Sequence, residues 1–479
     1  MDEQIASKGT LVMKFGGTSV GSPQAVAQAT RVVKETLAEW PRLVVVTSAM
    51  SGVTDLLLES AARAISGDLD FLQAAASHLR SQHQLVLQQL IPDADYRREV
   101  EAEIHRLLNE FSSLCRAISV IGESSPRALD AVASLGERVC VRMLEGVLRS
   151  AGLPAVAVEA TSLIVTDAQF GGAHPDLAAS SECTRGVLGK LLEAGQIPVV
   201  TGFIGATPQG VTTTLGRGGS DYSAAILGAI LPAEQVWIWT DVDGVMSADP
   251  RLVPQARTIP LLSYREIAEL AYYGAKVVHP KTIRPVIEAG IGLRVCNTFN
   301  PDHPGTRLVA NLSEEQVGLY QNGKIKGVTA IHNQSLITIE GRGMLGVPGV
   351  AARAFAAVAA TGTSVPLITQ ASSEQSICFA VPVEVAGRVV ASLEETFAME
   401  LNRRDIDRVW ASTQVTIVTV VGAGMRNTPG IAGRIFGKLG AEQVNVIAIA
   451  QGSSEVAVSL VVDAADAEAT LRGLHELIV

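Results

Sequence analysis

The sequence predicts an α/β fold, in which a mostly parallel sheet is sandwiched by helices and is followed by two small α+β units. Over the first 300 residues, short β-rich runs alternate with longer helical patterns, as expected for successive βαβ units. In the C-terminal part, one strand–helix–strand–strand–helix pattern occurs twice. A chain of 479 residues has room for about three ordinary domains, so one compact module is excluded.

Composition limits the class of protein and its partners. Hydrophobic residues make up 47% of the chain and charged residues 18%, which is typical of a globular protein. The net charge of -10 gives no basic surface for nucleic acid. The acidic N-terminus does not resemble a signal peptide, no apolar run is long enough to span a membrane, and the five scattered cysteines form no metal-binding pattern. We therefore expect a cytoplasmic protein without nucleic-acid or membrane partners.

The predicted elements follow the chain in a simple order. A helix is expected between the first two strands, and a long, mostly helical stretch follows the second strand because it contains few turn signals. Two prolines and a glycine in PDHPGTRL, after Asn300, indicate a domain boundary just beyond this segment. The expected strands cover 11–15, 42–50, 197–205 and 235–244, and the expected helical stretches cover 23–39 and 53–150.

The C-terminal repeat aligns the segment that begins at Gly341 with the segment that begins at Gly422, without a gap. Gln370 and Gln451 occupy equivalent places in ITQASSE and IAQGSSE. Two copies are too few for a solenoid, which needs about three. The repeat therefore predicts a fused pair of modules that share one sheet or one interface.

The first chemical motif is KFGGTSVG at 14–21, where the first strand ends and a helix is about to begin. A lysine followed by glycine N–H groups suits a phosphate site at the carboxyl edge of a parallel sheet. The motif is not a Walker A loop, because no Gly-Lys-Ser/Thr follows. The same residues contain a G-x-S-x-G pattern, so a serine hydrolase that uses Ser19 remains an alternative.

The second motif is TTTLGRGGSDYS at 212–223, directly before an alanine-rich helical pattern. Its glycines allow close approach of the backbone to an anion, and Arg217 can grip a carboxylate or a phosphate with two hydrogen bonds. Asp221 falls near the start of the helix. A purely structural loop needs neither charge, so this motif predicts anion binding.

Three further places carry candidate residues. TDVDGVMSADPR at 240–251 follows a strand and suits a nucleotide at the carboxyl edge of the sheet. YGAKVVHP at 273–280 offers Lys276 to phosphates, whereas His279 before proline is more typical of a packed or capping residue. Glu137 lies on a predicted helix, and its pattern alone indicates a solvated charge.

Taken together and in this order, KFGGTSV, SLGERVC, GFIG, TTTLGRGGSDYSA, TDVDGV with ADPR, and YGAKVVHP resemble the aspartate kinases of the amino-acid kinase family. The repeat resembles that family's paired ACT domains, which have a ferredoxin-like fold. On this basis we expect a catalytic domain at 9–310, a linker at 311–326, and ACT domains at 327–408 and 409–479. The resemblance covers the chain from about residue 11 to its end.

The resemblance implies transfer of the γ-phosphoryl group of ATP, bound with Mg²⁺, to the side-chain carboxylate of L-aspartate. The product, 4-phospho-L-aspartate, enters lysine, threonine and methionine synthesis. Lys14 would stabilise the transferring group, Asp221 would organise the phosphate network, Arg217 would clamp the α-carboxylate, and Glu137 would receive the α-amino group. No residue is predicted to bind a metal on its own. The remaining substrate positions are Ser48, Thr54, Phe203, Gly218, Gly219 and Ser220, and the nucleotide positions are Lys14, Gly16, Gly17, Thr18, Thr240, Asp241, Arg251 and Lys276.

The resemblance also implies regulation. Gln370, Gln451, Asn427 and Asn445 resemble effector positions of threonine-sensitive relatives. Threonine is therefore the favoured effector, and the alternatives are lysine and an enzyme that is insensitive to feedback. Paired ACT domains commonly associate, and a homodimer is expected. Met246 stands where the family commonly has tyrosine, which puts an aromatic contact near the nucleotide base in doubt. A non-catalytic amino-acid sensor that keeps the ACT pair remains a second alternative.

Overall fold

The computed structural model describes residues 9–272, 278, 280–310, 325–344, 346–371, 375–425, 428–451 and 456–478. The chain divides into two compact units, each of which is described by itself. Unit 1 takes the described residues within 1–245, 260–264 and 277–311, and unit 2 takes those within 246–259, 265–276 and 312–479. None of the helices formed by the described residues is long and apolar enough to cross a membrane.

Unit 1 is built on an eight-stranded sheet of order β3-β4-β2-β1-β7-β9-β10-β8. All neighbouring pairs are parallel except β9 and β10, which confirms the predicted mostly parallel sheet. A short hairpin of β5 (Ile204–Ala206) and β6 (Thr212–Thr214) lies outside this sheet. The strands of the sheet are β1 (Thr10–Phe15), β2 (Arg42–Thr47), β3 (Ala155–Val158), β4 (Ile197–Thr201), β7 (Gln235–Thr240), β8 (Leu261–Ser263), β9 (Gly292–Asn297) and β10 (Thr306–Val309).

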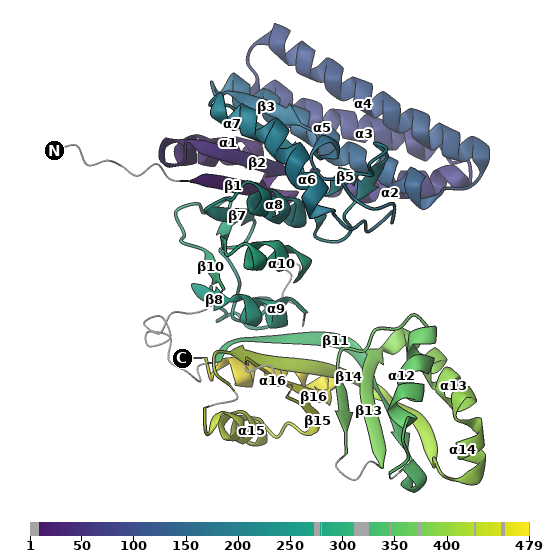
Figure 1. The fold of residues 1–479 in the computed structure, drawn as a ribbon. Coiled ribbons are helices and arrows are strands. Elements are labelled where there is room, and N and C mark those ends of the chain that lie inside the picture. The colour runs from purple at the N-terminus through teal and green to yellow at the C-terminus, as the bar shows by residue number, and fades with distance from the viewer. Residues whose placement is uncertain are drawn as a thin grey trace, which may run out of the picture. The chain divides into compact units, whose positions relative to one another are not determined.

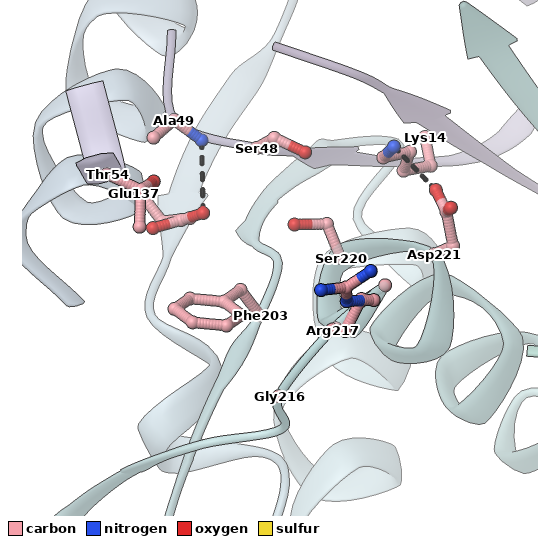
Figure 2. A pocket seen from close by; sticks show the side chains of 12 residues that line it. Lys14, Ser48, Ala49, Thr54, Glu137, Phe203, Gly216, Arg217, Ser220 and Asp221 are labelled. Atoms are coloured by element: carbon pink, nitrogen blue, oxygen red, sulfur yellow. Dashed lines mark hydrogen bonds and ion pairs between the residues drawn. The ribbon is translucent and has the colours of Figure 1, made fainter. Parts of the chain in front are cut away.

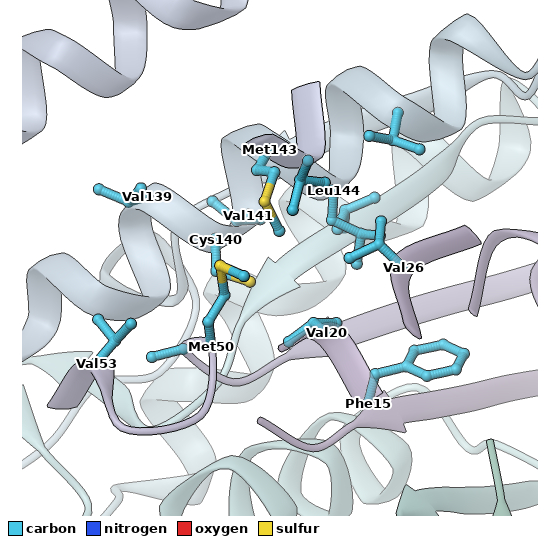
Figure 3. Packing of buried hydrophobic residues seen from close by; sticks show 14 of the residues in the cluster. Phe15, Val20, Val26, Met50, Val53, Val139, Cys140, Val141, Met143 and Leu144 are labelled. Carbon is cyan, nitrogen blue, oxygen red and sulfur yellow. The ribbon is translucent and has the colours of Figure 1, made fainter. Parts of the chain in front are cut away.

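Helices cover both faces of this sheet, as predicted. Leu11, Met13 and Phe15 of β1 pack in a core with residues from the five helices that precede β3 (Figures 1 and 3). On the opposite face, Gly228 of α8 lies so close to Val236 that a Cβ there would come within 2.6 Å of the valine side chain. The helices of the first face are α1 (Pro23–Glu39), α2 (Val53–Ile65), α3 (Leu69–Leu90), α4 (Ala94–Ile121) and α5 (Pro126–Ser150). The other helices of unit 1 are α6 (Leu177–Thr184), α7 (Lys190–Glu193), α8 (Gly219–Ile230) and α10 (Pro280–Glu288).

The starts of α1 and α5 follow directly from local sequence. Ser22 accepts a hydrogen bond from the Ala25 N–H, and Ser125 accepts one from the Ala128 N–H. In both helices a proline occupies the first turn, where no intrahelical N–H partner is lost. The Ser125 cap fixes where α5 begins, and α5 carries Glu137 of the site described below.

Unit 2 contains a six-stranded antiparallel sheet of order β12-β13-β11-β14-β16-β15 (Figure 1). Both repeats have the predicted strand–helix–strand–strand–helix order. The strands are β11 (Ile325–Glu340), β12 (Ile368–Gln370), β13 (Ser376–Pro382), β14 (Arg408–Gly422), β15 (Val446–Ala450) and β16 (Ala457–Asp463). The helices are α12 (Val350–Ala360), α13 (Ala386–Thr396), α14 (Ala398–Arg403), α15 (Ile431–Ala441) and α16 (Ala467–His475), together with α9 (Tyr264–Tyr272), which begins at the unit boundary.

The two modules share their central strands. The first part of β11 pairs with the last part of β14, and the second part of β11 pairs with β13 and with the first part of β14. Ile325 and Val328 therefore join the core of the second module, whereas Ile337 and Ile339, farther along the same strand, join the core of the first. Of the two predicted alternatives, a shared sheet or a shared interface, the structure has the shared sheet, and both β11 and β14 run through both modules.

A segment from the middle of the chain also belongs to unit 2. Ala248 and Val253 contribute to the core of the second module, and Ser247 bonds to the ring of His475 at 2.9 Å. On α9, Glu266 is fully buried and forms an ion pair of 2.8 Å with Lys326 of β11. Residues 246–259 and α9 are thus anchored to the repeated modules, although they lie between strands of the first sheet in sequence.

Candidate active site

The carboxyl edge of the first sheet carries a cavity of about 410 Å³ within unit 1 (Figure 2). Parallel strands bring their carboxyl ends to one edge, which is why residues far apart in sequence meet here. All ten residues predicted for catalysis or for the substrate lie around this cavity, and their roles stay predictions. The lining consists of Lys14, Ser48, Ala49, Thr54, Glu137, Phe203, Gly216, Arg217, Gly218, Gly219, Ser220 and Asp221.

Lys14 and Asp221 form an ion pair at one end of the cavity, as Figure 2 shows. The lysine Nζ lies 2.5 Å from Oδ1 of the aspartate, and the two side chains are only 10% and 14% exposed. Lys14 extends from the end of β1, and Asp221 stands in the first turn of α8. An acid at this position interacts favourably with the helix dipole. The pair therefore presents a held cation beside the N-terminus of a helix, which suits a phosphoryl group.

Glu137 occupies the other end of the cavity (Figure 2). The pattern alone indicated a solvated charge, but the side chain of this α5 residue is buried because the helix packs on the loop after β2. Oε1 accepts a hydrogen bond of 3.2 Å from the Ala49 N–H, whereas Oε2 is buried and has no partner within the described residues. Burial raises the pKa of Glu137 to about 8, against the lowering effects of the Ala49 bond and of the Lys14 charge.

The loop before α8 has a backbone that requires glycine. Gly216 and Gly218 have φ angles of 75° and 71°, in the left-handed region that disfavours side chains. Between them, Arg217 is exposed, and its guanidinium has no hydrogen bond or ion pair to any residue that the structure describes. The loop therefore holds a free cation next to the cavity.

Phe203 forms part of the cavity wall in a strained conformation. Its φ angle of 67° is unusual for a bulky residue, and two hydrogen bonds hold the conformation: the Phe203 N–H donates to Ser223 Oγ, and the Phe203 carbonyl accepts from the Leu215 N–H. A Cβ on Gly219 would come within 2.7 Å of the phenylalanine ring, so glycine is needed there for close approach. This strain leaves no signal in the sequence, and Ser223 and Ala49 were not among the predicted site residues.

The first glycine motif packs tightly beside the cavity. The Gly16 N–H donates to the Trp239 carbonyl at 3.1 Å, while Gly17 is partly exposed and Thr18 is exposed. Ser19 is fully buried and hydrogen-bonded to the Trp239 carbonyl and to Thr298 Oγ1. A nucleophile must be accessible and next to a base, so this burial contradicts the serine hydrolase alternative.

The structure places the other predicted nucleotide residues in different units. Thr240 ends β7 in unit 1, where its hydroxyl donates to Asp241 at 3.2 Å. Arg251 belongs to unit 2 and pairs with Asp249 at 2.6 Å. Lys276 lies outside the described residues. Met246 belongs to unit 2, and its sulfur accepts a long contact of 3.7 Å from the hydroxyl of Thr258.

The predicted effector residues lie at the edges of the second sheet. Gln370 ends β12 and Gln451 follows β15, and these two strands are the edges of the sheet. Both glutamines are exposed. Asn445 is exposed directly before β15, and Asn427 lies outside the described residues. The two edge strands contact each other across the curved sheet, around a small core that includes Leu367. Their effector role stays a prediction.

Comparison with known proteins identifies the family of this chain. Residues 9–297 match the amino acid kinase family, and residues 337–397 and 418–477 each match the ACT domain. The chain is 38% identical over 99% of its length to a chloroplastic bifunctional aspartokinase/homoserine dehydrogenase 2 of Arabidopsis thaliana, and it spans about half (51%) of that relative's length.

Two further relatives match along nearly their whole length. An aspartokinase of Schizosaccharomyces pombe is 32% identical over 99% of this chain and 93% of its own. The crystal structure of Escherichia coli aspartokinase III in complex with aspartate and ADP has a TM-score of 0.80 and 29% identity, and the match covers 98% of this chain and 99% of the other. The predicted resemblance is therefore confirmed, and the chain belongs to the amino acid kinase family, among the aspartokinases with two ACT domains.

Proposed function

We propose that this protein is an aspartate kinase, which transfers the γ-phosphoryl group of ATP to the side-chain carboxylate of L-aspartate. The observation that carries the proposal is the arrangement of charges in one cavity. Lys14 is held by Asp221 at one end, and Glu137 Oε2 lies at the other end without a partner among the described residues. The guanidinium of Arg217, which also bonds to no residue that the structure describes, lies beside them. An amino acid with an ammonium and two carboxylates complements this set, and a similar solved enzyme binds aspartate and ADP.

The reaction follows from this arrangement without a general base. The side-chain carboxylate of aspartate is already ionised at neutral pH, so it attacks the γ-phosphorus while the bond to the β-phosphate oxygen breaks and ADP leaves. Glu137 and Arg217 would hold the amino and α-carboxylate groups, and Lys14 would neutralise charge on the transferring group. The chain contributes positioning and electrostatic stabilisation, which is what phosphoryl transfer requires.

Mg²⁺ fits this site as an ion that the nucleotide carries. It prefers oxygen ligands and usually binds through substrate phosphates, waters and one or two carboxylates. Asp221 supplies a carboxylate at the phosphoryl end of the cavity, beside Lys14. Bound there, the ion would neutralise charge on the phosphates.

Aspartate-dependent release of ADP, with the acyl phosphate trapped by hydroxylamine, tests the proposal. The proposal expects ADP and aspartyl hydroxamate to form in equal amounts and only when both substrates are present. A protein that binds amino acids but forms neither product would favour the non-catalytic sensor.

Replacement of Arg217 by alanine should raise the KM for aspartate by roughly 30-fold, because a charged hydrogen-bonding group is lost. The KM for ATP and the melting temperature should change little, since Arg217 bonds to no described residue. Arg217→Lys should restore affinity only in part, because lysine lacks the two-pronged geometry. Steady-state kinetics with each substrate varied in turn checks this, and an unchanged KM for aspartate would refute the clamp.

We further propose that the ACT pair senses an amino acid, with threonine favoured and lysine as the alternative. The exposed Gln370 and Gln451 at the contacting sheet edges support an effector site there. The double variant Gln370→Ala, Gln451→Ala should lose inhibition by the effector, measured against its own uninhibited rate with lysine, threonine and methionine, singly and in pairs. Full inhibition of this variant would exclude both glutamines as effector contacts. A cytoplasmic location and a homodimer are part of the same proposal.

A further inference from the structure

Asp130 is a buried carboxylate that the proposed mechanism does not use. It lies on α5 and is only 3% exposed. Its Oδ2 accepts a hydrogen bond from the Thr214 N–H (2.9 Å), and its Oδ1 accepts one from the Thr214 hydroxyl (2.8 Å). The Gly171 N–H is shared by both oxygens, at 3.0 Å from Oδ2 and 3.1 Å from Oδ1. A buried carboxylate is normally compensated by a cation or by several donors. Among the described residues, the donors to Asp130 come from Thr214, at the end of β6, and from the Gly171 backbone.

Both partners of Asp130 support the loop that displays Arg217. Thr214 ends β6, three residues before the arginine. The Gly171 carbonyl and Gly172 underlie Gly216 so closely that a Cβ on Gly216 would lie 3.3 Å from that carbonyl oxygen. The carboxylate therefore ties α5 to the two backbone segments on which the base of the arginine loop rests.

The same helix carries Glu137 at the other end of the cavity. Seven residues separate Asp130 from Glu137, which is two turns of helix, so both lie on one face about 10 Å apart along the axis. A helix is stiff over this length, whereas the arginine loop has two left-handed glycines. A tie between the helix and the base of the loop consequently fixes how far Arg217 stands from Glu137.

We propose that Asp130 is a positioning residue that sets the span between Glu137 and Arg217, and with it the fit of the amino acid between its two clamps. This inference rests on the proposed function, because it assigns the amino and α-carboxylate groups to these clamps. Asp130 acts through Thr214 and Gly171 and touches neither the substrate nor the transferring group.

Asp130→Asn tests this role, because the Gly171 N–H bonds to both carboxylate oxygens, so in either orientation the amide group would turn an N–H donor toward it. We expect the KM for aspartate to rise about tenfold, as is typical of a small misplacement of a binding group, with the KM for ATP changed by less than about twofold. Ser134→Ala is the matched control, since it removes a buried hydroxyl from the same helix. Among the described residues, that hydroxyl bonds only to the Ala131 carbonyl. This variant should leave both KM values unchanged.

Variants of Thr214 test the same contact from the partner of Asp130, and they replace the first test if Asp130→Asn does not fold. Thr214→Val removes the hydroxyl bond and should raise the KM for aspartate about threefold, whereas Thr214→Ser should match the unaltered protein. In the double variant Asp130→Asn, Thr214→Val, the two effects should not multiply, because both act through one contact.

The outcomes separate this inference from the proposed function. If the unaltered protein shows no aspartate-dependent release of ADP, the proposed function fails. If it is active but Asp130→Asn or Thr214→Val leaves the KM for aspartate unchanged, the inference is overturned. An equal rise in both KM values would also overturn it, because general loosening of the fold affects both substrates.

Discussion

Replacement of Lys14 by methionine is expected to lower kcat by about a thousandfold, which is the size of effect seen when one donor to a transition-state charge is removed. Lys14 is held beside Asp221 at the end of β1, in the wall of the cavity. Methionine keeps the length and most of the packing of the side chain but removes the charge. Trapping of the acyl phosphate with hydroxylamine measures the rate.

Loss of Lys14 also leaves Asp221 as a nearly buried charge without its partner, so a fall in stability of about 3 kcal/mol is expected alongside the loss of activity. The double variant Lys14→Met, Asp221→Asn separates the two effects, because it should recover stability and remain inactive. Lys34→Ala, which removes an exposed lysine from α1, is the control for a general effect of charge. A Lys14→Met variant with near-normal turnover would exclude the assigned role.

Replacement of Glu137 by glutamine should lower kcat/KM for aspartate by roughly a hundredfold at pH 8.5, because the ammonium of the substrate loses a buried anionic partner. Burial raises the pKa of this carboxyl to about 8 from its usual 4.5. Below pH 8 the empty site therefore holds a proton that must leave before an ammonium can bind. In the unaltered protein, kcat/KM for aspartate should rise about tenfold per pH unit up to pH 8 and then level off.

The glutamine variant should lack this rise, so the two proteins should converge toward pH 6. The pH dependence of folding stability is a second measurement, and its expected direction follows from the same pKa shift. The unfolded chain ionises near pH 4.5 and the folded protein near pH 8, so Glu137 costs stability increasingly as the pH rises between these values. The melting temperature of the unaltered protein should fall relative to Glu137→Gln over this range. Equal pH profiles of the two proteins in both measurements would contradict the assignment.

The order of the elements and the glycine-rich loops could be predicted from the sequence, because both depend on local patterns. The strand at 11–15 and the helices over 53–150 lie where a hydrophobic run and the lack of turn signals predicted them. The strand expected at 235–244 ends at Thr240, and the single strand expected at 197–205 is divided into β4 and β5, which belong to different sheets. The repeat predicted that the two ACT modules share either a sheet or an interface, and the sequence did not decide between them. Membership of the family followed from motifs spread over the whole chain.

The rest depends on tertiary contacts that leave no local signal. Glu137 looks like any polar helical residue until the loop after β2 covers it, and Asp130 resembles a helix-surface acid until Thr214 and Gly171 meet it. The strain at Phe203 follows from its hydrogen bonds and not from its residue type. The local sequence also does not predict that residues 246–259 belong to unit 2, because they follow β7 of unit 1 closely in the chain.

Because β11 and β14 run through both ACT modules, the chain cannot be divided into two separate modules without disrupting both. A cut between residues 408 and 409, where the second module would be expected to begin, would leave the first fragment holding Ile325 and Val328, which belong in the core of the second. Each fragment would also expose an unpaired strand edge, a surface that promotes aggregation. The two modules therefore form one folding unit, and a truncation or a domain transfer should keep the pair whole.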